Sequence, residues 1–147
     1  MMAIGFMGEY NHTVDAKGRL IIPATYREKL GERFVVTKGI DDCLVVYAME
    51  QWEELLEKLS QISMTRQTNR NFNRFMLGKA GEVELDSHGR ILLNTAFREY
   101  AQIEKDVVLV GAGKYIEIWA KDKYEEMMNG LDISAIADEL DAAGIMI

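Results

Sequence analysis

Cysteine and proline are nearly absent from this chain of 147 residues, which contains one of each, Cys43 and Pro23. A single cysteine cannot form an internal disulfide, and its place in the apolar run 43–46 predicts a reduced, buried side chain. No segment approaches the roughly 20 consecutive apolar residues that a membrane-spanning helix needs. Residues 1–10 also lack the basic start and long apolar stretch of a signal peptide. We therefore expect a cytoplasmic protein that makes no membrane contact.

Basic residues are in the minority, because the formal net charge is -7. Phosphate contacts need Lys and Arg, so the total charge alone argues against nucleic acid as a partner. The distribution of charge changes this view, since residues 10–40 carry six basic and three acidic residues. No acid occurs between Glu57 and Glu82, where the basic residues are Lys58, Arg66, Arg70, Arg74 and Lys79. The placement of charge is therefore a better guide to partners than its sum.

One pattern of five residues, Asp-x-x-Gly-Arg, occurs twice, at residues 15–19 and 86–90. The likeness continues at the same shift of 71 through residues 20–22 and 91–93, and through 26–28 and 97–99. After a slip of one residue, three further matches follow: 35–36 with 107–108, 44–48 with 116–120, and 52–55 with 124–127. The sequence therefore predicts an internal duplication.

The length of each copy indicates how the copies are combined. A unit of roughly 60 residues buries only about 60% of the surface that its unfolded chain exposes, so either copy alone would be marginally stable. With 48% hydrophobic residues, the whole chain can bury an ordinary soluble core. We therefore expect the copies to interlock around one core with an internal pseudo-twofold relation.

Local patterns predict an α+β protein in which each copy has a strand, a short helix, a β-hairpin and a longer helix. Pro23 should end the first strand, and Gly31 the short helix that follows it. The expected segments of the first copy are a strand at 20–22, a helix at 24–30, hairpin strands at 34–36 and 44–47, and helices at 49–63 and 65–77. The second copy should place its hairpin at 107–110 and 115–119, and residues 133–140 have helical spacing.

The repeated pattern is typical of a tight turn. Asp accepts hydrogen bonds from backbone amides further along the chain, and Gly takes the positive φ of a sharp reversal. The Arg at the exit can pair with the Asp, or project outward as a five-donor fork suited to phosphates and guanine edges. The turn-forming residues would be Asp15, Gly18, Asp86 and Gly89. Lys17 adds a second charge beside Arg19, whereas the second copy has Ser87 and His88, so the first copy is the better candidate for DNA contact.

These residues resemble the MraZ family of bacterial transcriptional regulators. The likeness lies in residues 6–10, the two Asp-x-x-Gly-Arg turns, the segment 23–27 and the duplication itself, and it covers the chain to about Asn129. The doubled pattern at this spacing is specific, whereas either copy alone would be weak evidence. The acidic tail with an apolar end falls outside the likeness.

The resemblance implies two AbrB-like β-hairpin halves, interleaved in one pseudo-twofold, β-barrel-like core with flanking helices. It implies a homo-oligomer, assembled as a ring, that binds short direct repeats in double-stranded DNA upstream of the division and cell wall gene cluster, including the protein's own gene. The DNA-binding residues would be Lys17, Arg19 and Arg27, with Arg90 as a further candidate. The predicted parts are 1–78, the first half with its arginine-bearing helix, 79–129, the second half, and 130–147, an acidic helical tail.

Other chemistry finds little support in the sequence. The Gly111-Ala112-Gly113-Lys114 segment is too short for a phosphate-binding loop and precedes a β-rich run, so a hairpin turn is expected. His12, His88 and Cys43 lack metal-ligand spacing, and no nucleophile pattern accompanies Asp86 and His88. We expect no enzyme, no metal and no cofactor. Arg66, Arg70 and Arg74 fit a solvated or intersubunit face, with auxiliary DNA contact as the alternative.

Three hypotheses follow from the sequence. The first is an oligomeric, sequence-specific DNA-binding regulator associated with the nucleoid. The second is an AbrB-like antitoxin or partner-binding protein that uses its C-terminal tail, residues 133–147. The third is a structural ring-forming protein, which would show no salt-dependent affinity for DNA.

Overall fold

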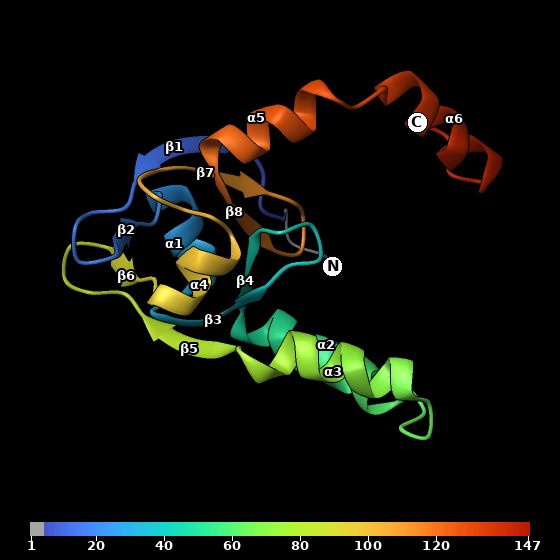
Figure 1. Ribbon diagram of the computed structural model, residues 1–147, viewed down its shortest axis with the longest axis horizontal. Coiled ribbons are helices and arrows are strands. Elements are labelled where there is room, and N and C mark those ends of the chain that lie inside the picture. The colour runs from blue at the N-terminus through green and yellow to red at the C-terminus, as the bar shows by residue number, and fades with distance from the viewer. Residues whose placement is uncertain (1–4) are drawn as a thin grey trace.

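A computed structural model describes residues 5–147 of the chain as two antiparallel sheets and six helices (Figure 1). In chain order the elements are β1 (Glu9–Thr13), β2 (Arg19–Ile21), α1 (Ala24–Leu30), β3 (Arg33–Lys38), β4 (Leu44–Ala48), α2 (Met49–Ser60), α3 (Gln67–Gly78), β5 (Gly81–Glu84), β6 (Arg90–Leu92), α4 (Thr95–Tyr100), β7 (Asp106–Gly111), β8 (Ile116–Ala120), α5 (Lys121–Asn129) and α6 (Ile133–Ala142). The elements predicted from local patterns occur in the expected order, but strands β1 and β5 were not predicted. The apolar periodicity predicted that this helix would continue to residue 63, but helix α2 ends at Ser60.

The larger sheet has six strands in the order β1-β7-β8-β4-β3-β5. Each of its two edge strands pairs with a strand of the other copy. Strand β1 of the first copy pairs with β7 of the second, and β5 of the second copy pairs with β3 of the first. Neither copy can therefore complete its part of the sheet alone. The sheet is open, with β1 and β5 at its edges, so the described residues do not close into a barrel, and the β-barrel-like core that the resemblance implies is not confirmed.

Strands β2 and β6 form a separate two-stranded sheet, in which each residue pairs with the other copy. Leu20 lies opposite Ile91, its own counterpart in the duplication. At the centre of the larger sheet, Leu44 pairs with Ile118 and Val46 with Ile116. The two copies thus meet through equivalent segments at both sheets.

The register of the hairpins corrects one match made from the sequence. Phe34 lies opposite Ala48 in the first copy, and Val107 lies opposite Ala120 in the second. Val107 is therefore the counterpart of Phe34, so the shift at these strands is 73 and the match of 35–36 with 107–108 was wrong by one residue. Strand side chains alternate between faces, and a slip of one residue would move the core-facing set to the other face.

The main core lies between the two sheets and the short helices α1 and α4. It includes residues from both copies, all nearly inaccessible to water, such as Leu20, Tyr26, Phe34, Ile91 and Leu109. A second, smaller cluster contains Cys43, Val45, Val108, Trp119 and Tyr124. The expected burial of Cys43 is confirmed, since only 1% of its surface is exposed.

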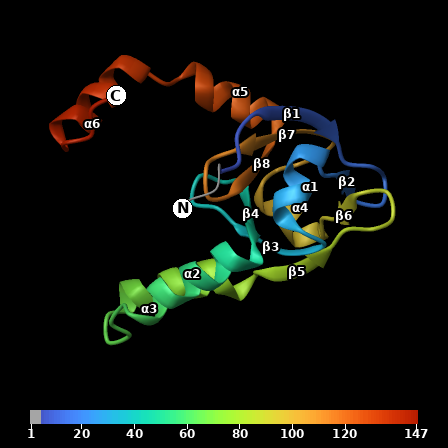
Figure 2. The same cartoon turned by 180° about the vertical axis from the view of Figure 1, so that it is seen from behind.

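Two appendages extend from this body (Figure 2). Helices α2 and α3, with the turn at 61–66, form a helical hairpin that leaves the end of β4 and returns to β5. Helices α5 and α6 lead away from the end of β8 on another side. Within the described residues, no helix is long and apolar enough to cross a bilayer.

Candidate nucleic-acid interface

The first Asp-x-x-Gly-Arg segment forms the predicted tight turn. The Gly18 amide donates a hydrogen bond of 2.9 Å to the Asp15 carbonyl, and the Asp15 amide donates one of 3.0 Å to the Arg19 carbonyl. The Asp15 carboxylate accepts from the backbone amides of Lys17 and Arg19 at 3.0 and 2.9 Å. Gly18 has a φ of 85°, a backbone conformation that residues with a side chain rarely adopt.

The Arg19 side chain folds back onto the turn. Its Nε lies 2.7 Å from Asp15 Oδ2, with 34% and 37% of the two side chains exposed. The backbone amide of Arg19, together with this ion pair, lowers the pKa of Asp15 from its usual 3.8. The expected salt bridge is thus present, and it uses Nε and leaves the two terminal nitrogens of the guanidinium at the partly exposed edge of the turn.

The second segment repeats this geometry almost atom for atom. Asp86 Oδ1 accepts from the amides of His88 and Arg90, each at 2.9 Å, and Arg90 Nε lies 2.8 Å from Asp86 Oδ2. The amide of Arg90 is the largest cause that lowers the pKa of Asp86, to about 2. The copies therefore differ in the residue at the tip, His88 in place of Lys17, and not in the Asp and Arg geometry.

The two turns lie side by side at one end of the molecule (Figures 1 and 2). The pairing of β2 with β6 holds them there, and two cross-copy bonds extend it. The Leu93 amide donates to the Gly18 carbonyl at 2.8 Å, and the Ile22 amide donates to the Gly89 carbonyl at 2.9 Å. We call residues 15–18 and 86–89 the paired turns.

Two further arginines reach across the duplication to the paired turns. A Cβ at Gly89 would collide with the guanidinium of Arg27, so this side chain of the first copy lies directly on the second turn. A Cβ at Gly18 would lie 3.2 Å from Nη2 of Arg98, which brings the second copy's arginine onto the first turn. Arg27 was predicted from the sequence to lie in the site, whereas Arg98 was not, although the shift of 71 that relates 26–28 to 97–99 makes it the counterpart of Arg27.

These two arginines are held differently. Arg98 Nε donates to the Leu93 carbonyl at 3.0 Å, and its Nη2 lies 3.3 Å from Thr95 Oγ1. Across residues 5–147, no hydrogen bond or ion pair engages the guanidinium of Arg27. The paired turns thus gather five permanent cations, Lys17, Arg19, Arg27, Arg90 and Arg98, around two carboxylates. Such an excess of guanidinium groups on a projecting edge suits the phosphates and base edges of a nucleic acid.

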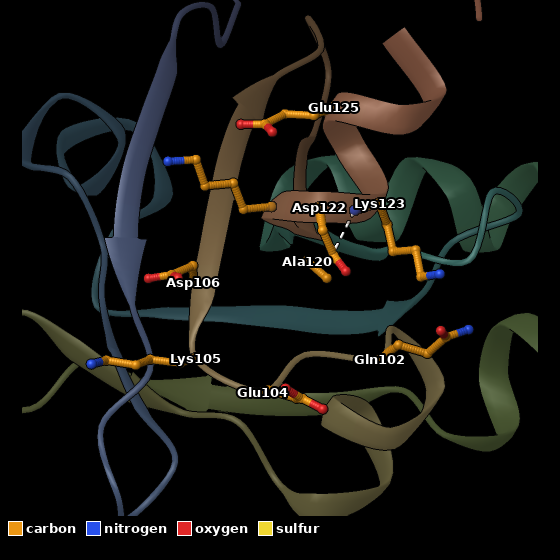
Figure 3. Close-up of a pocket in the computed structure, with 9 residues that line it drawn as sticks. Gln102, Glu104, Lys105, Asp106, Ala120, Asp122, Lys123 and Glu125 are labelled. Carbon is orange, nitrogen blue, oxygen red and sulfur yellow. Dashed lines mark hydrogen bonds between the residues drawn. The ribbon is translucent and has the colours of Figure 1, made fainter. Parts of the chain in front are cut away.

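Other candidates for a site have weaker chemistry. A cleft of about 460 Å³ between the β7 and α5 ends is lined by acidic and basic side chains in alternation, among them Glu104, Lys105, Asp106 and Asp122 (Figure 3). The expected hairpin turn between β7 and β8 is present and comprises residues 112–115, with the Ala112 amide donating to the Tyr115 carbonyl at 2.9 Å. Among residues 5–147, no group of three His, Cys, Asp or Glu side chains could hold a metal ion.

Helix α3, which carries Arg70 and Arg74, lies far from the paired turns, at the opposite side of the molecule in both views (Figures 1 and 2). Arg70 Nη1 donates to the carbonyls of Met64 and Thr65 at 2.9 and 3.1 Å, so it stabilises the turn of the helical hairpin. Arg66 and Arg74 are exposed. This placement favours the solvated or intersubunit face over a DNA contact shared with the paired turns.

Fold and site together define a class of protein, in which two copies of one β-hairpin unit exchange strands and present paired basic turns. The family model described as "MraZ protein, putative antitoxin-like" matches the chain twice, over residues 5–75 and 76–144. The chain belongs to the MraZ family.

Relatives in this family match nearly the whole chain. A protein of Thermoanaerobacter sp. (strain X514), named "Transcriptional regulator MraZ", is 50% identical over 141 residues, which cover 95% of this chain and 99% of the relative. Proteins of the same name from Moorella thermoacetica and Clostridium tetani are 54% identical over 121 residues and 45% identical over 141 residues. These alignments cover 82% and 95% of this chain, and 85% and 99% of the respective relatives. A transcriptional regulator belongs to a non-enzymatic class, as expected for this chain.

Proposed function

We propose that this chain is a sequence-specific DNA-binding transcriptional regulator that contacts duplex DNA with its paired turns. The observation that carries the proposal is the convergence of five cations, drawn from both copies, on one projecting edge of the molecule. The names of the relatives support the same function.

Within this function we assign separate roles to the cations. Lys17 and the terminal nitrogens of Arg19 contact bases or phosphates at the tip of the first turn. Arg27, which is not engaged by the described residues, contacts the DNA backbone beside the second turn. Arg90 contributes less, because His88 replaces the neighbouring lysine. Asp15, Gly18, Asp86 and Gly89 maintain the turns.

The target we propose is a set of short direct repeats upstream of the division and cell wall gene cluster, including the protein's own gene. A good bidentate contact contributes only about 1 to 3 kcal/mol of discrimination between bases, which is too little for a specific site. Several subunits in a ring would each place one pair of turns on one repeat, and their tethered contacts would add through effective concentration. In this assembly each subunit has halves 1–78 and 79–129 with an internal pseudo-twofold relation, which the pairing of Leu20 with Ile91 supports, and a separate tail, 130–147.

The experiment that tests the proposal is a gel shift and footprint on the DNA upstream of the protein's own gene, at several salt concentrations. The wild type should protect an array of short direct repeats, and Arg19→Ala should lose the protection while keeping its fold and oligomeric state. Lys121→Ala, an exposed cation at the start of α5, is the matched control and should bind normally. Protection that Arg19→Ala retains would move the DNA contact away from the paired turns.

A second candidate function is partner binding through the tail, in the manner of an antitoxin. The exposed apolar residues of α6 and of 145–147 favour it, and the family description includes the term antitoxin-like. Copurification of a small protein, lost on deletion of residues 131–147, would support this function. Homogeneous rings of this chain alone would count against it.

A further inference from the structure

Strands β2 and β6 form a two-stranded ribbon at the end of the molecule that carries the paired turns (Figure 1). One face of the ribbon is buried, because Leu20 and Ile91 are 0% and 1% exposed and belong to the main core. Successive side chains of a strand point to opposite faces. The other face therefore carries Ile21 and Leu92, which are 46% and 60% exposed. These two residues are counterparts at the shift of 71, so both copies place an aliphatic side chain in solvent here.

The two exposed aliphatic side chains lie beside the two turn arginines. Arg19 pairs with Leu92 across the ladder, and Arg90 pairs with Ile21. Residues directly opposite each other in a ladder share a face, so all four lie on the same surface. We call these four residues the outer ribbon face. Each of its guanidinium groups has an aliphatic side chain directly across the ladder.

The paired turns bound the outer ribbon face at both ends. The Gly18 carbonyl accepts from the Leu93 amide at one end, and the Gly89 carbonyl accepts from the Ile22 amide at the other. The five cations of the paired turns exceed the two carboxylates by three, and each carboxylate is already paired with an arginine. Positive charge on both sides of an apolar surface complements a polyanion that presents apolar groups between its charges.

Duplex DNA is a polyanion of this kind. Its major groove is about 12 Å wide and admits a two-stranded β-ribbon. The apolar groups in that groove are the C5-methyl groups of thymine, which apolar side chains contact, whereas arginine pairs with the O6 and N7 atoms of guanine. We propose that Ile21 and Leu92 contact thymine methyl groups in the major groove. This inference rests on the proposed DNA-binding function and adds to it two side chains that recognise a particular base.

The register of the ribbon allows contact with more than one base pair. Ile21 and Leu92 are offset by two residues along the ladder, which is about 7 Å at roughly 3.4 Å per residue. Successive nucleotides of one DNA strand are about 3.4 Å apart along the helix axis. The two side chains can therefore contact methyl groups of different base pairs.

DNA that contains deoxyuridine tests the proposal, because this nucleoside keeps every hydrogen-bonding group of thymidine and lacks only the C5-methyl group. The probe is the fragment upstream of the protein's own gene, synthesised with either thymidine or deoxyuridine and titrated in gel shifts at one salt concentration. The wild type should bind the deoxyuridine fragment at least about fourfold more weakly, the effect expected for one buried methylene. The double variant Ile21→Ser with Leu92→Ser should bind both fragments alike.

The matched control is Ile40→Ser. Ile40 is 73% exposed and lies in the connection between β3 and β4, outside the ribbon. This variant should bind as tightly as the wild type and keep the full preference for thymidine. Circular dichroism and light scattering after gel filtration should show the wild-type fold and mass for every variant. If the double variant does not fold, Ile21→Ser and Leu92→Ser are compared singly, and each should reduce the preference.

The outcomes separate this inference from the proposed function. A wild type that binds both fragments equally would overturn the inference and leave the DNA-binding function intact. A folded double variant, or both single variants, with an undiminished preference for thymidine would overturn it as well. A double variant of altered mass would assign the outer ribbon face to a contact between copies of the chain instead. If the wild type binds neither fragment, the proposed DNA-binding function fails and takes this inference with it.

Discussion

The guanidinium of Arg27 lies directly on Gly89, so an arginine of the first copy covers the turn of the second. The counterpart of this contact, Arg98 near Gly18, is looser, at 3.2 Å from the position of a Cβ. The two turns are therefore not independent loops, because each is buttressed by the other copy.

Gly89→Ala should destabilise the protein for two reasons, a φ of 74° and a collision with Arg27. The left-handed conformation alone costs roughly 1 to 2 kcal/mol in the free energy of unfolding for a residue with a side chain. Gly113→Ala is the comparison for this cost, since Gly113 has a φ of 85° and open space around it. Urea unfolding should show a larger loss for Gly89→Ala, and Arg27→Ala added to Gly89→Ala should recover the difference. Equal losses at Gly113 and Gly89 would show that the Arg27 contact is unimportant.

Arg27→Ala should weaken DNA binding with little loss of stability, because no hydrogen bond to the described residues is removed. Removing one phosphate contact should reduce the slope of log K against log salt by about 0.9. Arg98→Ala is the comparison, and it removes the bonds to the Leu93 carbonyl and Thr95 hydroxyl, so it should lower the unfolding midpoint. An unchanged salt slope in Arg27→Ala would contradict the assigned backbone contact.

Arg19→Ala and Arg90→Ala should have equal, small effects on stability and unequal effects on DNA binding. The ion pairs are alike, at 2.7 and 2.8 Å, and both are partly exposed. Loss of a base contact by Arg19 should weaken binding by about 1 to 3 kcal/mol, whereas Arg90 should lose less. The two tip residues can be exchanged by making Lys17→His and His88→Lys in one chain. In that chain Arg90→Ala should weaken DNA binding more than Arg19→Ala does. Equal losses of DNA affinity in the folded proteins would refute the asymmetric assignment.

The sequence predicted much of this fold because the duplication repeats its local signals. The Asp and Gly of each turn, Pro23 after the first strand and the β-branched hairpin strands all act over a few residues. Edge strands β1 and β5 left weaker signals, since β1 reads Glu-Tyr-Asn-His-Thr with no apolar alternation. Their exchange between copies depends on long-range pairing, which local pattern does not encode.

The register and Arg98 were missed for related reasons. Residues 107–110 are a continuous apolar run without alternating polar residues. The sequence pattern therefore could not distinguish an offset of 72 residues between the two copies from an offset of 73. Arg98 acts on a turn of the other copy, and its role becomes visible only when β2 and β6 bring the turns together. Whether the predicted residues Lys17, Arg19, Arg27 and Arg90 bind DNA stays a prediction.

Asp86 should remain ionised in acid, since its pKa is about 2 in the folded chain against an ordinary value of 3.8. A pKa lowered by folding means that the interaction stabilises the protein above about pH 4 and is lost as the pH falls toward 2. The largest cause is the backbone amide of Arg90, which Arg90→Ala retains. Carboxyl carbon NMR should therefore still find a lowered pKa for Asp86 in Arg90→Ala. A return to 3.8 would show that the guanidinium dominates instead.

Cys43 should be inert in the folded protein. Burial, with the carboxylate of Glu117 nearby, raises the pKa of its thiol to about 12, and its Sγ donates to Glu117 Oε2 at 3.8 Å. Only the thiolate attacks disulfide reagents, so at pH 8 modification must await an opening of the structure. The rate of reaction with an aromatic disulfide reagent should be very low in buffer and should rise sharply through the urea transition. Glu117→Gln serves as the comparison, since it removes the nearby charge and retains burial, and its thiol should stay protected. Fast modification of the native wild type would mean that the cluster around Trp119 and Tyr124 opens readily.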